Sequence, residues 1–423
     1  ELLSSLVRMA SGPCPSLRLV AIELSARIGQ VVSKQAVHAR LNGGFTRFVS
    51  GVVTRAMERV YDRLDRPAAG VFAHFGRVLL QDSTVVTLPA RLAEAFPGAR
   101  NQTGKVRSAM KLQTVFDLKR DRYESVGITA FNRNDQAASP DIARDLRPGD
   151  LLIRDLGYFV LSAFTLVAES GAYFLSRLRS NTKLHDPESL EEISLFKLLR
   201  KRDALDIDVL VGAVDRIPVR LVARRVPMKV AAERRRQARR NRDKRLKPSA
   251  EKLALLDWEI FITNVPSQIW TDSMVCQVYG FRWPIEVLFK TWKSYLQLAS
   301  LPQSASETQA ICLALARILN ATTFHAKVWY AVKHGLQQRG THASILKTMS
   351  AFVAPCADRL LRMADEAPEA LLEILTKHCS YEKRRRLSHG AIFDSYADLT
   401  ENRPERHSTR HATNAGGGAC ILA

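Results

Sequence analysis

Three acidic residues stand in otherwise apolar stretches of the chain and could act together on a metal ion. Asp82 interrupts the run RVLLQDSTVVTLP, Asp155 follows LLIR, and Glu286 lies within YGFRWPIEVLFKTWK. Carboxylates from distant positions can gather around Mg²⁺, which prefers oxygen ligands and keeps open positions for water and phosphate. Two such ions about 4 Å apart can activate a water or a 3′-hydroxyl for in-line attack on a phosphodiester. The acids therefore indicate metal-dependent phosphodiester chemistry.

Each of these acids also has an ordinary structural explanation. Asp82 could face water at the edge of a sheet, and Asp155 could cap the turn before Gly157. Glu286 could be a first-turn glutamate that the helix dipole favours. Taken singly, these roles are the commoner ones, but the order of the three acids and the elements that carry them favour a shared site.

The segment around Glu286 has the pattern of a helix with one apolar and one charged face. At about 100° per residue, Glu286, Lys290 and Lys293 fall within a narrow arc. The opposite side carries large apolar residues with the spacing of a helix packed on a core, and they are Ile285, Leu288, Phe289, Trp292, Tyr295 and Leu296. The simpler alternative is a solvated helix face with charges at i, i+4 and i+7.

The residues before this helix bring a phenol and a guanidinium close to Glu286. Pro284 suits the first position of a helix, where its missing N–H costs nothing. We therefore expect Tyr279 and Arg282 in the turn that leads into the helix.

The elements that must hold the acids follow from the pattern of the central chain. We expect strands at 77–89, 111–130 (two strands), 151–154 and 172–178, and helices at 135–146 and 160–170. The two strands within 111–130 are joined by a turn at 119–122, and the helix at 135–146 has Ser139 as N-cap. The order β-β-β-α-β-α-β is that of an RNase H-like domain, an α/β fold with a mixed sheet. Asp82 lies in its first strand and Asp155 at the end of its fourth.

A strongly basic stretch follows in a region that we interpret as an insertion. Residues 229–247 hold ten Lys and Arg against two acids, and include Arg234, Arg235, Arg239 and Arg240. Such a run is usually a solvated arm, but it could also track a phosphate backbone.

The chain as a whole divides by composition and periodicity into six expected parts. The first is helical, and its short helices, with Ser33 as an N-cap and a break at Gly43-Gly44, suit either a helix-turn-helix-like DNA-end-binding region or a plain helical bundle. The parts are 1–70, helical; 71–180, RNase H-like core, first part; 181–265, β-rich insertion with the basic arm; 266–300, core, second part, with the Glu286 helix; 301–400, a C-terminal helical region that could serve dimerisation; and 401–423, a disordered tail.

Charge and hydropathy narrow the class of partner. The 423 residues carry 63 Lys and Arg against 42 Asp and Glu, a formal charge of +21, which predicts a polyanionic partner such as nucleic acid. No apolar run approaches the roughly 18–20 residues that span a bilayer, and we expect no signal peptide. The six cysteines lack the spacing of a zinc site. A soluble intracellular protein is expected.

These motifs together resemble the DDE transposases of bacterial insertion sequences, in particular insertion-sequence family four. The likeness rests on Asp82, on Asp155-Leu-Gly-Tyr-Phe as the pattern D-x-G-[FY]-F, and on Tyr279-x2-Arg282-x3-Glu286-x6-Lys293 as the Y-R-E-K signature of that family. It covers about residues 75 to 300. Family members carry a β-rich insertion between the second Asp and the Glu, in agreement with the insertion expected at 181–265.

The resemblance implies a role for each of these residues. Asp82, Asp155 and Glu286 would bind two Mg²⁺ ions, with Mn²⁺ as a substitute, and Tyr279, Arg282 and Lys293 would hold phosphates near the cleaved end. Lys290 lies outside the signature and would assist at most. Trp258 in LDWEIFITNVP matches the place where a tryptophan of some relatives stacks on a flipped base, although a core tryptophan is an equal alternative.

The activity implied by the resemblance is transposition. The chain would bind the terminal inverted repeats of its element as double-stranded DNA, cut each end, and join the 3′-hydroxyl to target DNA. A homodimer would hold the two ends, in the bacterial cytoplasm and associated with the nucleoid through DNA. Two rivals stay open, an RNase H-like nuclease without strand transfer and a catalytically inactive DNA-binding derivative.

Overall fold

The computed structural model describes residues 1–10, 16–59, 70–100, 106–240 and 248–381. Apart from these gaps, the chain forms two compact units. The first unit comprises 1–59, 80–134 and 284–381, and the second comprises 70–79 and 135–283. The expected tail at 401–423 and the end of the basic arm at 241–247 lie outside the described residues.

The first unit contains a sheet that carries Asp82. Its strands are β1 (Val78–Leu88), β2 (Pro97–Arg100), β3 (Val106–Asp117) and β4 (Arg122–Ala130). Both β2 and β4 pair antiparallel with β3, and β1 is a further neighbour of β3. The first four residues of β1 are buried, whereas Asp82 is half-buried. An apolar strand therefore presents one acid where continuous burial gives way to alternating buried and exposed positions.

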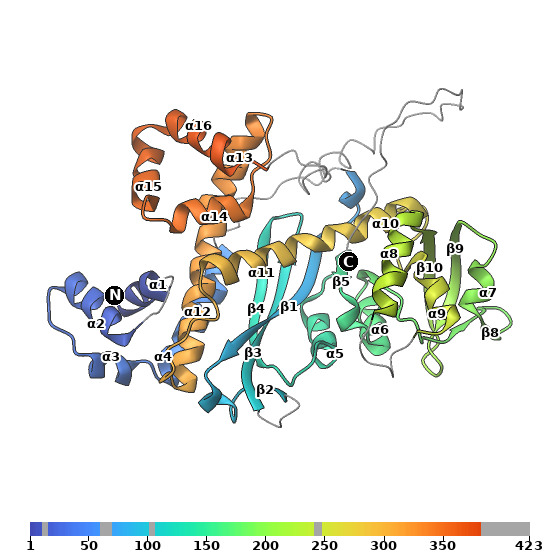
Figure 1. The fold of residues 1–423 in the computed structure, drawn as a ribbon, viewed down its shortest axis with the longest axis horizontal. Helices are drawn as coiled ribbons and strands as arrows, with labels where there is room; N and C mark the ends of the chain where they lie inside the picture. Colours follow the sequence, from blue (N-terminus) through green and yellow to red (C-terminus); the bar gives the residue numbers. More distant parts are fainter. Residues whose placement is uncertain (11–15, 60–69, 101–105, 241–247, 382–423) are drawn as a thin grey trace. The chain divides into compact units, whose positions relative to one another are not determined.

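Helices make up the rest of the first unit. Figure 1 shows α11 running across the strands β1, β3 and β4, and α4 packs against α12 and β4. Ser33 caps α3 as expected, but Gly43 begins α4 instead of breaking a helix. The helices are α1 (Leu2–Ala10), α2 (Leu17–Ile28), α3 (Lys34–Arg40), α4 (Gly43–Arg59), α11 (Trp283–Tyr295), α12 (Glu307–Phe324), α13 (Tyr330–Gln338), α14 (Ile345–Val353), α15 (Ala357–Glu366) and α16 (Pro368–Cys379).

An aromatic cluster fixes α11 on the sheet of the first unit. Tyr123 of β4 is buried, and its hydroxyl accepts a hydrogen bond from the Trp292 indole N–H of α11 at 3.3 Å. The Tyr123 ring also contacts Phe116 of β3 and His325, with ring centroids 5.4 and 5.1 Å away. Because α11 carries Glu286, this cluster sets the position of that acid along the sheet.

A second anchor ties the turn between β3 and β4 to the C-terminal helices. Between α12 and α13 the helix widens into a π-helical turn, His325–Trp329. His325 Nε2 lies 3.1 Å from Asp121 Oδ1, while the Trp329 indole N–H and the Lys333 ammonium donate to Asp121 Oδ2 at 3.3 and 2.5 Å. Asp121 has a φ of +51°, which Asp and Asn tolerate better than most residues. The Asp121 carboxylate thus contacts three side chains, two from the π-helical turn and one from α13.

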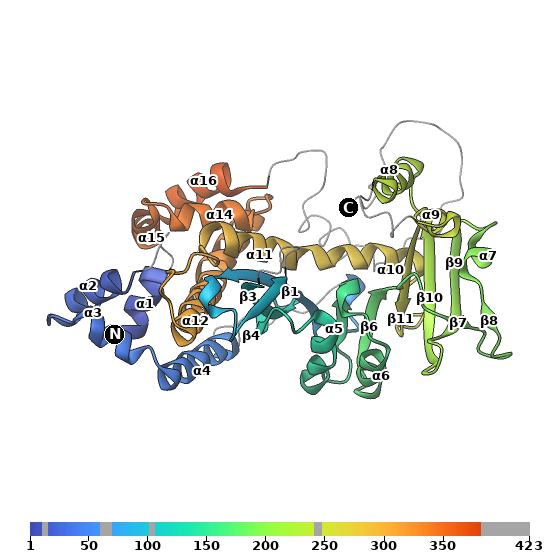
Figure 2. The ribbon, with the colours of Figure 1, turned by 60° about the horizontal axis from the view of Figure 1, so that its bottom comes forward.

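The second unit contains a sheet whose strands run in the order β5-β6-β11-β10-β9-β7-β8. Figure 2 shows β6, β11, β10 and β9 side by side in this sheet. Strand β5 is parallel to β6, and the other pairings are antiparallel. The strands are β5 (Leu151–Arg154), β6 (Tyr173–Arg177), β7 (Leu184–His185), β8 (Glu192–Ile193), β9 (Ala204–Val211), β10 (Ile217–Arg225) and β11 (Trp258–Thr263).

The helices of the second unit are mostly short. Helix α6 packs against β6 and α10 against β10. They are α5 (Asp135–Ala138), α6 (Leu161–Glu169), α7 (Leu195–Leu199), α8 (Met228–Arg239), α9 (Ala250–Leu255) and α10 (Asp272–Tyr279).

The mixed α/β class predicted from the sequence is confirmed, and several local expectations need correction. The expected helix at 135–146 is a four-residue α5 followed by a 3₁₀ helix, Ser139–Asp145. Ser139 is not its N-cap, because its buried hydroxyl donates to the Tyr158 carbonyl and accepts from Arg154. The basic stretch begins as the regular helix α8. Among the described residues, no helix is both long and apolar enough to span a bilayer.

The Asp121 anchor predicts a pH-dependent contribution to stability. Burial alone would raise the pKa of Asp121, but Lys333 and His325 lower it by more, so the folded pKa lies below the unfolded value. The contribution is therefore complete above about pH 4 and declines as the pH falls further. Asp121→Asn, which tolerates the same backbone, should lower the free energy of unfolding by about 3 kcal/mol at pH 7. Urea unfolding at pH 7 and pH 3 measures this, and the difference from wild type should narrow at pH 3.

The matched control is the exposed ion pair between Arg339 and Glu369, in which the Glu369 side chain is 83% exposed. Glu369→Gln should leave stability almost unchanged. Equal losses in the two variants would contradict a special role for Asp121.

Candidate functional site

Two of the three predicted acids line one open pocket in the first unit. The pocket has a volume of about 350 Å³ and lies between β1 and α11. Asp82 comes from β1 and Glu286 from the first turn of α11, and both are half-buried. The lining residues are Asp82, Ser83, Thr84, Glu286, Phe289, Lys290, Lys293 and Ser294. Strand and helix therefore bring together carboxylates that are 204 positions apart in the sequence.

The charged face predicted for the Glu286 helix is the face that lines this pocket. Glu286, Lys290 and Lys293 all border it, and both lysines are exposed. The apolar positions Ile285, Leu288 and Trp292 on the same helix are buried. Two acids and two cations thus share one cavity, an arrangement that suits a cation held by the acids beside an anion held by the lysines.

The third acid, Asp155, belongs to the second unit. It follows β5 as the N-cap of a short 3₁₀ helix, and its Oδ2 accepts a 3.4 Å hydrogen bond from the Gly157 N–H. The capping role considered from the sequence is therefore present. Asp155 also faces Arg282, whose Nε lies 3.8 Å from Asp155 Oδ1. This arginine is the second member of the signature that was recognised in the sequence.

Gly157 is closely surrounded by carboxylates. A Cβ at this position would lie 3.4 Å from Asp135 Oδ2 and 3.8 Å from Asp155 Oδ2. Sequence reasoning placed Asp135 only at the start of a helix and missed its closeness to this site. No local signal could have found it, because its approach to Gly157 is a tertiary contact.

Tyr279 lies beside Arg282, but in a helix and not in the expected turn. It is the last residue of α10, and its ring packs on Phe261 with centroids 4.9 Å apart. The residue is 8% exposed, and its hydroxyl has no hydrogen-bond partner among the described residues. Burial raises the pKa of Tyr279 to about 12, although the positive charges of Arg177 and Arg282 act in the opposite direction. A buried, unsatisfied donor of this kind is costly.

Trp258 begins β11, the position expected from the sequence, but it occupies a core environment. The residue is 7% exposed, and the Arg225 guanidinium lies 5.1 Å from the ring centroid. Stacking on a base would require Arg225 to move away from this ring.

The four arginines of the basic stretch fall into two classes. Arg234 donates to Glu259 at 3.0 Å, and Arg235 forms an ion pair with Asp257, so this half of α8 is bound to its own sheet. Arg239 and Arg240 are exposed at the C-terminal end of the helix. Only the second pair retains the solvent exposure that was expected of a phosphate-tracking arm.

The metal expectation is supported by the donor set of the pocket. Asp82 and Glu286 supply the oxygen ligands that Mg²⁺ prefers. Within the described ranges, no group of three or more His, Cys, Asp and Glu side chains is close enough to hold a metal ion. The pocket of the first unit contains two of the three carboxylates that the sequence predicts as metal ligands.

Two buried tyrosines allow the role of the Tyr279 hydroxyl to be tested. Tyr279→Phe removes an unsatisfied donor, so the free energy of unfolding should stay constant or rise by up to about 1 kcal/mol. Tyr123→Phe leaves the Trp292 N–H without its acceptor and should lower it by about 1 kcal/mol. Chemical denaturation of both variants checks this, and an equal loss in both would show that the Tyr279 hydroxyl has a partner within the fold.

Comparison with known proteins identifies the family to which the chain belongs. Residues 73–320, more than half of the chain, match the family model described as "Transposase DDE domain". The chain is 27% identical over 305 residues to the transposase for insertion sequence element IS231D of Bacillus thuringiensis subsp. finitimus, covering 67% of this chain and 63% of that protein. It is 25% identical over 321 residues to the transposase for IS1151 of Clostridium perfringens, covering 70% and 67%.

One solved structure is also similar, a piggyBac transposase synaptic complex with hairpin DNA. The similarity has a TM-score of 0.44 and 13% identity, and it covers 92% of this chain and 77% of that one. The match to IS231D spans 63% of that relative's length. On the strength of the family match, which includes Asp82, Asp155 and Glu286, the chain belongs to the transposase DDE domain family.

Proposed function

We propose that this chain is the catalytic protein of a bacterial insertion sequence, of the group called family four. It binds the terminal inverted repeats as double-stranded DNA, cuts each end, and joins the freed 3′-hydroxyl to a target phosphodiester. The observation that carries the proposal is the pocket in which Asp82 and Glu286 meet Lys290 and Lys293. Acids for a metal and cations for a phosphate are the two requirements of this reaction.

In this proposal Asp82, Asp155 and Glu286 hold two Mg²⁺ ions, for which Mn²⁺ substitutes. When bound, the metal supplies a lowered pKa for the attacking water or hydroxyl and offsets charge on the leaving oxygen. The inclusion of Asp155 is supported by the family match, which spans all three acids. The proposed fold of the catalytic part is RNase H-like.

The basic and phenolic residues position the DNA strand. Arg282 and Lys293 bind phosphates beside the cut, and Lys290 assists from the same helix face. The buried Tyr279 hydroxyl donates to a phosphate oxygen, which would satisfy a donor that has no partner among the described residues. Trp258 stacks on a flipped base once Arg225 has moved from its ring.

Other parts of the chain serve binding and assembly in this proposal. The helices of 1–70 bind the ends, and the insertion 181–265 contributes Arg239 and Arg240 to the DNA surface, with Arg234 and Arg235 supporting them from α8. The core comprises 71–180 and 266–300, and the helices of 301–400 serve a homodimer that holds two ends together. The protein acts in the bacterial cytoplasm, at the nucleoid.

A cleavage and strand-transfer assay tests the catalytic proposal. Purified protein, Mg²⁺ and a plasmid carrying the DNA that flanks this gene are combined, and cut and joined products are measured. Glu286→Gln should lower both by at least about a hundredfold, because the amide is a poor ligand for a hard cation. Glu307→Gln is the matched control, since Glu307 is also a first-turn glutamate but lies exposed on α12.

Each outcome of this assay separates the proposal from its rivals. Cutting without joining would support a nuclease. Binding of the flanking DNA without cutting, together with no effect of replacing Asp82, Asp155 or Glu286, would support an inactive DNA-binding derivative and overturn the proposal.

A salt titration tests the DNA surface on α8. Replacing both Arg239 and Arg240 with Gln should weaken DNA binding and reduce the slope of log K against log[salt] by up to about 2, because each phosphate contact releases a counterion. Fluorescence anisotropy at several KCl concentrations measures the slope. Replacing the exposed Arg359 and Arg362 of α15 removes the same net charge and should leave the slope nearly unchanged. Equal slopes in the two double variants would place the DNA elsewhere.

A further inference from the structure

A short turn with several fixed contacts joins the helices α2 and α3 of the first unit. Gly29 caps the C-terminal end of α2, with a φ of +69° that favours glycine and an N–H that donates to the Ser25 carbonyl at 3.0 Å. The Ser25 hydroxyl accepts from the Val32 N–H at 2.9 Å. Ser33 then caps α3, because its hydroxyl accepts from the Ala36 N–H at 3.1 Å. Two helices joined by a turn of a few residues that contains glycine have the connection of a helix-turn-helix.

One face of α3 is held on a core. Val37 is buried, and so is Leu41, the residue that follows the helix. Helix α2 packs against both α1 and α3 (Figure 1), and Val20 and Leu24 of α2 are buried as well. Because this one face holds α3 in place, the opposite face is left to solvent.

The exposed face of α3 has a neutral centre with a cation on each side. At about 100° per residue, Gln35 and Ala39 lie roughly opposite the two buried positions of α3. Lys34 lies on one side of this central line and Arg40 on the other. All four residues are exposed. The face thus presents an amide and a methyl group between two positive charges.

The charge around α3 suits a polyanionic partner. Residues 28–57 contain no Asp or Glu, whereas a solvated face of a plain helical bundle usually mixes both signs of charge. The basic residues of this stretch are all exposed, and they are Lys34, Arg40, Arg47 and Arg55. Charge complementarity therefore favours nucleic acid over a second protein surface.

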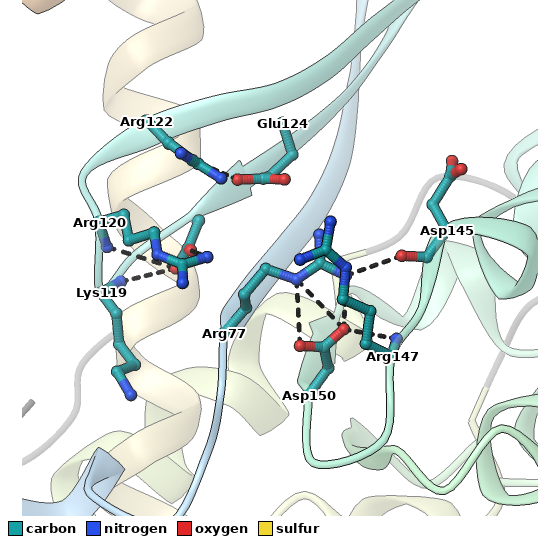
Figure 3. A network of polar contacts seen from close by, with 9 residues as sticks. Arg77, Lys119, Arg120, Arg122, Glu124, Asp145, Arg147 and Asp150 are labelled. Atoms are coloured by element: carbon teal, nitrogen blue, oxygen red, sulfur yellow. Dashed lines mark hydrogen bonds and ion pairs between the residues drawn. The ribbon is translucent and has the colours of Figure 1, made fainter. Parts of the chain in front are cut away.

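The side chains of Lys34 and Gln35 are available for binding. Neither has a hydrogen-bond or ion-pair partner among the described residues. Cations elsewhere in the chain are occupied by acids, and Figure 3 shows two examples, Arg122 with Glu124 and Arg77 with Asp150. The donors and acceptors of α3 therefore remain for a partner molecule.

The major groove of double-stranded DNA fits this face. The groove admits a helix, presents base edges at its floor and is bounded by a phosphate backbone on each side. The planar amide of Gln35 carries both an acceptor and a donor, which match the N6–H and N7 groups of adenine. Ala39 is small enough for close approach, and its methyl group suits contact with a thymine methyl.

We propose that α3 is the helix that recognises bases at the ends of the element, and that Gln35 determines specificity for an adenine there. Lys34 and Arg40 bind the phosphates on the two sides of the groove and carry no sequence information. This inference rests on the proposed function, in which the N-terminal helices bind the ends, and it names the residue that distinguishes one base pair from another.

Selection from a random DNA library tests base recognition without any need for cleavage. The full-length chain is mixed with random double-stranded oligonucleotides in EDTA, and the bound sequences are determined after several rounds. Gln35→Arg should change one position of the selected sequence from A·T to G·C, because a guanidinium matches the O6 and N7 groups of guanine. Gln35→Ala should lose the preference at that position alone, and should bind the wild-type sequence about tenfold more weakly.

The matched control is Gln337→Arg, since Gln337 is an exposed glutamine of α13. This variant adds the same charge as Gln35→Arg but should select the wild-type sequence. Lys34→Gln and Arg40→Gln give a second contrast. Each should weaken binding to a similar degree on every sequence, because phosphate contacts do not distinguish bases.

The outcomes separate this inference from the proposed function. A wild-type selection that enriches no sequence, or the same selected sequence for wild type and both Gln35 variants, would overturn the inference. A selected sequence that changes in Gln35→Arg but is absent from the DNA flanking this gene would support base recognition by α3 and contradict the proposed end binding. Its presence there in inverted orientation would support both. If Gln35→Arg binds no DNA, Gln35→Ala carries the measurement.

Discussion

Repulsion between carboxylates is the constraint on which the rest of this structure depends. Asp82 and Glu286 line one open pocket, and two negative charges held in one pocket repel each other. Lys290 and Lys293 border the same pocket and offset this repulsion. The surrounding elements must still keep the acids in place. Strand β1 does so through its buried first residues, and α11 through the contact of Trp292 with Tyr123.

The two halves of the signature Y-R-E-K have different environments, which suggests different tasks. Glu286 and Lys293 border the open pocket of the first unit, where water and a polyanion can enter. Tyr279 is buried in the second unit and Arg282 is largely so, with its side chain 14% exposed. A buried arginine facing Asp155 has little freedom, so it holds a partner in a fixed direction. The exposed lysine has more freedom and suits a looser contact with an anion.

The sequence predicted those features that depend on local periodicity or spacing. The 3.6-residue pattern placed Glu286, Lys290 and Lys293 on one face of α11, and the apolar run placed Asp82 in β1. Features that depend on tertiary contacts could not be read in this way. The pairing of Arg234 with Glu259 and the burial of Tyr279 arise from strands and helices that meet only in the fold. A run of arginines has the same local pattern whether its charges face water or a neighbouring strand.

Because of the π-helical turn at His325–Trp329, the number of residues between α12 and α13 is constrained as well as their identity. Such turns arise when one residue is inserted into an α-helix. Removing one residue would restore a regular helix, but it would also rotate α13 by about 100° relative to α12. His325 and Lys333 could then no longer reach Asp121 together. Related proteins should therefore vary in length in the loops between the C-terminal helices, and keep the spacing across this turn constant.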